Sequence, residues 1–149
     1  MEISGNRLIP ANVNATWAAL NDLEVLKACI PGCEALTACP DDGFEVVMAL
    51  KIGPIGARFR GQLTMTQVQA PHGYTLNFEG QGGVAGFGKG SANVALEEEG
   101  SETRLRYQAH AQVGGKIAQV GSRLIDAAAG KVAEAFFKRF EQNLKVVSA

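Results

Sequence analysis

The residues most suggestive of chemistry form a glycine-rich stretch in the middle of the chain. Residues 80–90 read GQGGVAGFGKG, and the glycines before Lys89 have the spacing that opens a phosphate-binding P-loop, whose amides and lysine hold phosphate groups. Gly90 stands where a P-loop has Ser or Thr, and the following residues alternate like a strand, whereas a P-loop opens a helix. We therefore interpret the stretch as a flexible hairpin with Phe87 near its tip, where an exposed aromatic side chain could close a cavity or contact a partner.

Acid–base candidates are scarce among the apolar positions expected to face the interior. Tyr74 and Tyr107 are the only ionisable side chains there, and a half-buried tyrosine is usually structural. His110 shares the polar side of its strand with Arg104 and Arg106, which is typical of a solvated face; a docking patch for an acidic partner is the alternative. No G-x-S-x-G or H-E-x-x-H motif occurs. The residues favour binding over catalysis, and no catalytic residue is assigned.

Three cysteines, Cys29, Cys33 and Cys39, lie close together in the sequence. Their odd number argues against a disulfide framework. A zinc site needs four ligands at suitable spacing, and neither His72 nor His110 supplies a recognisable partner motif. We therefore interpret the cysteines as small buried thiols, and predict neither a metal nor a cofactor.

The composition is typical of a single globular domain. With 149 residues, 46% of them hydrophobic and 19% charged, the chain can bury a sizeable core, and residues 1–149 are predicted to form one domain. The net charge of −1 gives no general attraction to nucleic acid, which is not a predicted partner. The N-terminus lacks the layout of a secretory signal, and no apolar run approaches about 18 residues. A cytoplasmic location is expected.

The strongest structural signal is the apolar periodicity of the C-terminal part of the chain. Hydrophobic residues recur at steps of three or four from Ile117 to Leu144, which is typical of one face of an α-helix. The pattern predicts one helix from about Lys116 to about Lys145, roughly 45 Å long at 1.5 Å per residue. Because such a helix must bury its apolar face against another element, we expect it to lie across a sheet.

The preceding segments alternate with a period of two, which predicts strands. A strand over residues 2–11 is followed by short helices over 13–20 and 23–29, and then by six strands between 34 and 113. A shift in the alternation near residues 67–68 indicates a β-bulge. Each strand has one apolar and one polar side, typical of an antiparallel sheet covered on one side. The sequence therefore predicts an α+β fold in which a seven-stranded curved antiparallel sheet wraps around the long C-terminal helix.

Small residues lie on both surfaces that this fold brings together. Gly61, Gly80 and Ala109 occupy the apolar side of the strands, and Ala127–Ala129 lie on the helix. Two curved surfaces lined by small side chains can leave an apolar cavity of ligand size, although larger neighbours could fill it. The residues predicted to line the cavity are Phe59, Leu63, Met65, Leu76, Phe78, Leu105 and Tyr107 on the sheet and Val120, Leu124 and Ala128 on the helix, with Phe87 and Lys89 at its rim.

Four blocks of sequence resemble the CoxG family of carbon monoxide dehydrogenase subunits. They are NDLEVLKACIPGCE (residues 21–34), KIGPIGARFRG (51–61), GQGGVAGFGKGSA (80–92) and AQVGGKIAQVGSRLI (111–125). They occur in the family's order and extend over most of the chain. The family belongs to the START-like, or Bet v 1-like (SRPBCC), helix-grip superfamily, so the resemblance implies the architecture that the periodicity predicts.

The resemblance also implies a function. Family members are non-catalytic accessories of molybdenum hydroxylases that act in membrane recruitment of the enzyme or in electron transfer to membrane quinone. A quinone or another lipid-like molecule would suit the cavity, and peripheral contact with the inner face of the cell membrane is one location that the resemblance implies. Several members carry a tail associated with membrane attachment, whereas this chain ends at Ala149, which leaves ligand binding and docking on a molybdenum hydroxylase as the expected roles.

Two other functions stay open on the sequence alone. An enzyme of the cyclase or hydratase type would use Tyr74 or Tyr107 as a general acid, because fold does not decide function. A structural assembly factor with a filled core would bind a hydroxylase without holding a ligand. The presence of an interior cavity would favour the ligand-binding hypothesis, and its absence would favour the assembly factor.

Overall fold

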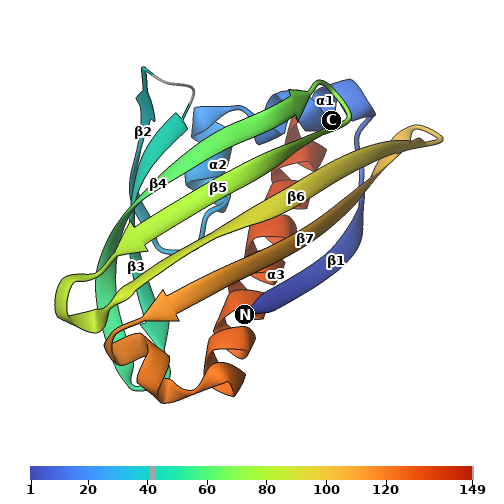
Figure 1. Ribbon diagram of the computed structural model, residues 1–149. Helices are drawn as coiled ribbons and strands as arrows, with labels where there is room; N and C mark the ends of the chain where they lie inside the picture. Colours follow the sequence, from blue (N-terminus) through green and yellow to red (C-terminus); the bar gives the residue numbers. More distant parts are fainter. Residues whose placement is uncertain (41–42, 149) are drawn as a thin grey trace.

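The computed structural model describes residues 1–40 and 43–148, which form one sheet, three α-helices and two short 3₁₀-helices (Figure 1). The predicted order, one strand, two short helices, six strands and a final helix, is confirmed. The elements are β1 (Glu2–Ile9), α1 (Val13–Leu20), α2 (Leu23–Cys29), β2 (Cys33–Cys39), β3 (Gly43–Ile52), β4 (Ile55–Gln69), β5 (Gly73–Gln81), η1 (Gly83–Ala85), β6 (Phe87–Glu99), β7 (Glu102–Gly114), η2 (Lys116–Val120) and α3 (Ser122–Ser148).

The sheet is antiparallel throughout, with the strand order β1-β7-β6-β5-β4-β3-β2. Strands β2 to β7 follow one another as neighbours, and β1 pairs with β7 to form the far edge. Figure 1 shows the sheet curving around α3, with α1 and α2 at the upper end of the molecule. The predicted α+β helix-grip fold is confirmed.

Local signals in the sequence explain where several elements begin and bend. The Asn12 side chain caps α1 by accepting a hydrogen bond from the Ala15 amide at 2.8 Å, and Asp22 caps α2 in the same way. In β4 the pairing register shifts after Thr66, where Gln67 adopts a positive φ of 51°. This is the β-bulge that the broken alternation predicted, and it lets the long strand bend with the sheet.

The C-terminal helix begins later than the periodicity predicted. Residues 116–120 form the separate 3₁₀-helix η2. Gly121 then interrupts the helical conformation with a φ of 98°, which glycine adopts readily. The prediction of one helix from Lys116 was wrong because steps of three and four residues do not show where a short break interrupts them. The break rotates the buried face, so that Ile125 is buried and Leu124 is 45% exposed. No helix in the described residues is both long and apolar enough to cross a membrane.

The glycine-rich stretch forms a strand hairpin, as predicted, and its tip is η1. Phe87 lies beyond the tip as the first residue of β6 and pairs with Gly114 of β7. The ring covers this glycine so closely that a Cβ there would come 2.5 Å from a ring carbon. In a P-loop the lysine stands at the start of a helix, whereas Lys89 lies within strand β6. The phosphate-binding geometry is therefore not formed.

The densest packing surrounds the C-terminal half of α3. Phe140, Ile9 and Leu105 are fully buried there, within a cluster that α1 and β5–β7 complete. Two fully buried hydroxyl groups, of Thr16 and Thr103, are satisfied by backbone carbonyls, which removes the penalty for burying them. The segment of the helix around Phe140 is therefore occupied by close-packed side chains, and any internal space must lie beside the preceding turns.

Candidate functional site

An apolar cavity of about 590 Å³ lies between the sheet and α3. Its volume falls within the range of roughly 300–1,000 Å³ that is typical of small-molecule sites. The strands contribute alternate residues, as on β4, where Phe59, Gly61, Leu63 and Met65 line the cavity and the residues between them do not. The pleat thus makes the wall almost entirely hydrocarbon.

The space exists because small residues meet where α3 crosses the sheet. Ala128, Ala129 and Ala133 line the cavity from the helix, and Gly61 and Gly88 line it from the sheet. None of these side chains reaches far enough to fill the gap between the two surfaces. The alternative of a core filled by larger neighbours is therefore wrong, and the predicted cavity is present.

The structure places most of the predicted lining residues on the cavity wall. Three do not line it: Leu124, Val120 and Phe87. The break at Gly121 turns Leu124 away, and Leu124 approaches the β3–β4 turn instead, with its Cδ1 atom 3.2 Å from a Cβ placed on Gly53. Phe87 is 48% exposed. The predicted residues on the wall are Phe59, Leu63, Met65, Leu76, Phe78, Lys89, Leu105, Tyr107 and Ala128.

Other lining residues were not assigned to the cavity from the sequence. Val46 and Met48 on β3 alternate as clearly as the residues of β4, so the same period-two signal could have included them. Ile125 replaces Leu124 on the helix because of the break at Gly121. Ile30, which follows α2, reaches the cavity only through tertiary packing, for which the sequence contains no local signal.

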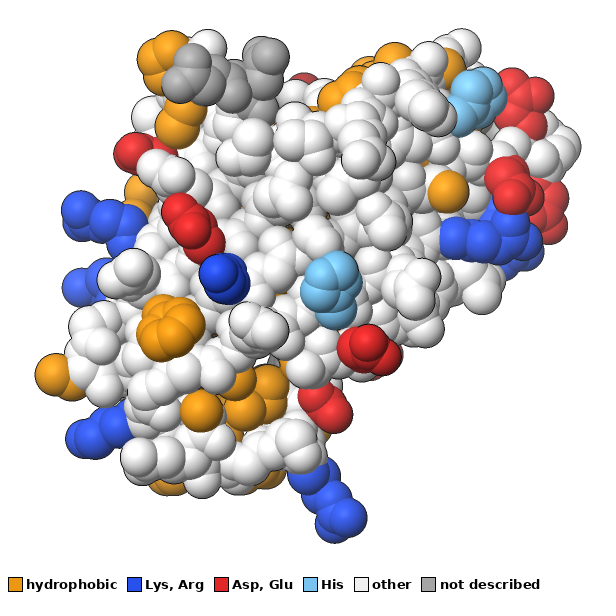
Figure 2. All heavy atoms as spheres, viewed as in Figure 1, with side chains coloured by type: hydrophobic (Ala, Val, Ile, Leu, Met, Phe, Trp, Pro, Cys, Tyr) orange, Lys and Arg blue, Asp and Glu red, His pale blue; other side chains and the backbone are white. Residues whose placement is uncertain are grey.

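Charged side chains occur only at the border of the cavity among the residues that line it. Lys51, Glu79, Lys89 and Lys131 contribute to the lining, and all four residues are exposed. A ligand inside would therefore contact hydrocarbon along its length and meet charge only where the cavity opens. In Figure 2, hydrophobic side chains are visible at the lower end of the molecule, where α3 begins and β7 ends.

The two tyrosines are the ionisable groups of the apolar wall. Tyr74 is 8% exposed and packs edge-to-face against Trp17, with ring centroids 5.6 Å apart. Burial raises the pKa of Tyr74 to about 12, so its phenol stays protonated and can donate a hydrogen bond to a ligand oxygen. Tyr107 stacks on Phe137 at 5.2 Å, and its hydroxyl lies against Gly5 of β1. Both rings serve as wall elements with one polar atom each.

Tyr74 is expected to make the fold less stable at alkaline pH. Its pKa is raised from 10.0 to about 12, so its contribution is complete below pH 10.0 and is lost as the pH rises through about 12. The unfolded chain releases the proton first, and the unfolding free energy should fall by about 1.4 kcal/mol per pH unit in that window. Urea unfolding of wild type and Tyr74→Phe across the window tests this. The variant should show a shallower decline, and equal slopes would contradict the assignment.

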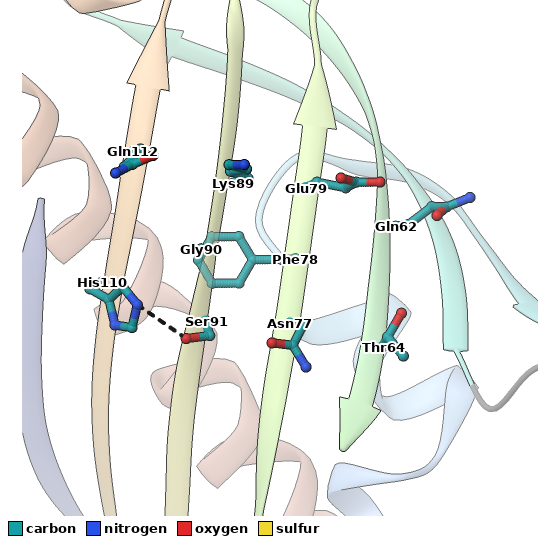
Figure 3. Close-up of a pocket in the computed structure, with 10 residues that line it drawn as sticks. All are labelled: Gln62, Thr64, Asn77, Phe78, Glu79, Lys89, Gly90, Ser91, His110 and Gln112. Atoms are coloured by element: carbon teal, nitrogen blue, oxygen red, sulfur yellow. Dashed lines mark hydrogen bonds between the residues drawn. The ribbon is translucent and has the colours of Figure 1, made fainter. Parts of the chain in front are cut away.

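A shallower polar groove of about 460 Å³ crosses the outer face of the sheet (Figure 3). Ser91 and His110 project from neighbouring strands, with 3.4 Å between Oγ and Nε2. This pair lacks the arrangement of a catalytic triad, because no carboxylate in the described part of the chain hydrogen-bonds to the imidazole. The groove is lined by Gln62, Thr64, Asn77, Phe78, Glu79, Lys89, Gly90, Ser91, His110 and Gln112.

The arginines near His110 do not form a free cationic patch. Arg104 donates two hydrogen bonds to Glu99, and the pair lowers the pKa of that carboxyl; Arg106 pairs with Glu97. Figure 2 shows a mostly uncharged outer face between the few charged groups. The interpretation as a solvated face fits this arrangement better than a docking patch for an acidic partner.

The cysteines differ in exposure from the prediction. All three are free thiols, but only Cys29 is buried, whereas Cys33 and Cys39 are partly exposed. Burial raises the pKa of the Cys29 and Cys33 thiols, which keeps them protonated and weakly nucleophilic at neutral pH. Within residues 1–40 and 43–148 no group of three His, Cys, Asp or Glu side chains is arranged to hold a metal ion.

Solved structures share this fold along nearly their whole length. A conserved protein from Geobacillus kaustophilus is 26% identical, with a TM-score of 0.91 over 97% of this chain and 95% of that one. A START superfamily protein from Mycobacterium smegmatis is 13% identical, with a TM-score of 0.73 over 98% of both chains. The Zhui aromatase/cyclase from Streptomyces sp. R1128 is 8% identical, with a TM-score of 0.67 over 97% and 93%. The last two likenesses concern the fold alone.

The sequence match is more specific than these likenesses. No curated protein matches the chain. The sequence profile of the CoxG family matches residues 5–145, which include all four blocks recognised in the sequence. Family membership, a START-like fold and an interior apolar cavity together indicate a ligand-binding accessory protein. The chain belongs to the CoxG family of carbon monoxide dehydrogenase subunits.

Proposed function

We propose that this protein is a non-catalytic accessory of a molybdenum hydroxylase of the carbon monoxide dehydrogenase type, and that it holds a quinone or lipid-like molecule in its cavity. The observation that carries the proposal is the cavity itself, which has about 590 Å³ of space with charge only at its border. Desolvating a polar or charged ligand against hydrocarbon would cost several kcal/mol without compensating hydrogen bonds. An apolar ring with a hydrocarbon tail meets no such penalty.

A quinone fits the few polar groups of the wall. Its carbonyl oxygens are hydrogen-bond acceptors, and the protonated phenol of Tyr74 is a donor beside the cavity. The protein would hold the quinone in the cytoplasm or at the inner face of the membrane. It would thereby aid membrane recruitment of the hydroxylase or electron transfer from it to the membrane quinone pool.

Fluorescence titration tests ligand binding directly, because Trp17 is the single tryptophan of the chain. Its ring contacts Tyr74, which lines the cavity, so a bound quinone lies close enough to quench it. Decylubiquinone, a quinone with a short alkyl tail, should quench Trp17 saturably. A hydrophilic quinone of the same ring, without the tail, should bind much more weakly. Absence of saturable quenching at high micromolar decylubiquinone would contradict the proposal.

One observation favours an enzyme as the second candidate. An aromatase/cyclase shares the fold, and the cavity contains two phenols. The high pKa of Tyr74 makes it a weak general acid near neutral pH, which is why we rank this function second. Turnover of a cyclisable substrate that is lost in Tyr74→Phe/Tyr107→Phe would establish the enzyme instead.

A further inference from the structure

Three chain connections come together at one end of the molecule, at the lower left of Figure 1. They are the β3–β4 turn (residues 51–56), the β5–β6 connection (81–88) and the β7–α3 connection (114–124). Gly53 of the first approaches Leu124 of the third, and the second and third meet backbone to backbone at Gly86 and Gly115. They therefore form one continuous surface, which we name the loop end.

The loop end exposes large hydrophobic side chains. Val84 at the tip of η1 is 88% exposed, Phe87 is 48% exposed and Leu124 is 45% exposed. Val84 and Phe87 belong to the β5–β6 connection and Leu124 to the β7–α3 connection. Together they account for most of the large hydrophobic side chains that the described part of the chain leaves exposed, the others being Leu8 and Val68. A cluster of this kind on one surface marks a site of interaction.

The loop end is also positively charged, although the chain as a whole carries −1. Its three connections contain Lys51, Lys116 and Arg123, all exposed, and no Asp or Glu. Of the charged residues that flank them in sequence, Glu79 and Lys89 balance each other, as do Asp126 and Lys131, and Arg58 pairs with Glu34. An excess of positive charge therefore lies on the surface that also exposes the apolar side chains.

The opposite side of the molecule has the reverse character. The β6–β7 hairpin contains four glutamates between positions 97 and 102, of which Glu97 and Glu99 pair with arginines of β7. Figure 2 shows acidic side chains together with basic ones at the right of the view, and basic side chains along its left and lower edges. A negatively charged surface would therefore orient the protein with the loop end toward it.

The cavity extends to the loop end. Lys51 and Ile52 of the β3–β4 turn line it, as do Ile117 of η2 and Gly88 where β6 begins. A molecule leaving the cavity past these residues would emerge among the exposed apolar side chains. The cavity wall thus continues into the surface that exposes the apolar side chains.

From these observations we propose that the loop end docks on an anionic lipid bilayer. Lys51, Lys116 and Arg123 would contact the head groups, while Val84 and Leu124 insert among the upper acyl chains. The cavity then opens toward the hydrocarbon in which an apolar ligand dissolves. The inference deepens the proposed function, on which it rests, by naming the surface and the partner. Its test does not depend on the identity of the ligand.

Vesicle flotation with two matched variants tests the docking. Lys116→Glu/Arg123→Glu reverses two loop-end charges, neither of which lines the cavity. Lys27→Glu/Lys138→Glu applies the same change in net charge at exposed positions on α2 and α3 outside the loop end. Vesicles of phosphatidylcholine with phosphatidylglycerol are compared with phosphatidylcholine alone. Decylubiquinone titration in vesicle-free buffer and thermal unfolding are measured on the same samples.

Wild type should float with the anionic vesicles, and high salt should weaken this binding. The loop-end reversal should lower partitioning by about tenfold or more, at a typical effect of roughly fivefold per basic side chain. The control reversal should lose much less. Val84→Ser/Leu124→Ser should weaken binding without changing its salt dependence.

The proposal is overturned if wild type does not bind anionic vesicles, as a protein partner for this end would predict, or if both reversals weaken binding equally. Quinone binding that persists in buffer would show that only the docking proposal has failed.

Discussion

Replacing Ala128 by Phe is expected to lower the affinity for decylubiquinone by at least about a hundredfold, or roughly 2.7 kcal/mol. Ala128 lies on α3 and lines the cavity, where its methyl group faces open space. A phenyl ring at this position would project into the volume that the ligand is proposed to occupy. Filling an existing void avoids most of the strain that overpacking causes in a dense core. The variant should therefore fold normally and lose binding.

The neighbouring residue supplies the control. Ala127 is exposed and does not line the cavity, so Ala127→Phe adds the same ring to the same helix on the side that faces solvent. It should keep wild-type affinity in the Trp17 quenching assay. The two variants should also have similar circular dichroism spectra. Equal affinities of Ala127→Phe and Ala128→Phe would show that the ligand binds outside the cavity.

Much of the fold was predictable because it depends on local patterns. Alternation over β3, β4, β5 and β7 placed those strands, and α1 and α2, expected over residues 13–20 and 23–29, are capped by Asn12 and Asp22. The first residues of β6 show no alternation in the sequence, because Gly88, which lines the cavity, and Gly90 stand where a strand usually has apolar side chains. Glycine carries no side chain, so the alternation becomes visible only from Ala92 onward.

The cavity was predictable in kind but less so in detail. Small residues on both surfaces indicated the space, and the strand pleat assigned the sheet wall. The prediction that Leu124 lines the cavity was wrong because Gly121 interrupts the helix and α3 begins only at Ser122. The break changes which side chains of α3 face the sheet. The clustering of Val84, Phe87 and Leu124 at one end depends on loops meeting in space, and a linear sequence contains no signal for that.

The second large effect is expected at Phe140, where α3 packs into the core instead of lining the cavity. Phe140→Ala should lower the unfolding free energy by about 3–5 kcal/mol, a large share of the roughly 5–15 kcal/mol typical of a domain. The ring is fully buried, stacks against Phe136 at a centroid distance of 5.8 Å and belongs to the main core cluster with Ile9 and Leu105. Its removal leaves a cavity in the part of the molecule that is most densely packed.

Comparison with Phe136 separates stability from binding along this one helix. Phe136 is partly exposed and lines the cavity, whereas Phe140 does not line it. In urea unfolding, Phe136→Ala should therefore cost less stability than Phe140→Ala, but it should weaken quinone binding more. Should Phe140→Ala not fold, Phe140→Leu is expected to lose about 1–2 kcal/mol and to retain wild-type affinity. A stability loss at Phe140 no larger than that at Phe136 would mean that α3 is packed alike at the two positions, contrary to the division between a densely packed segment around Phe140 and the part of α3 from Ile125 to Phe137 that borders the cavity.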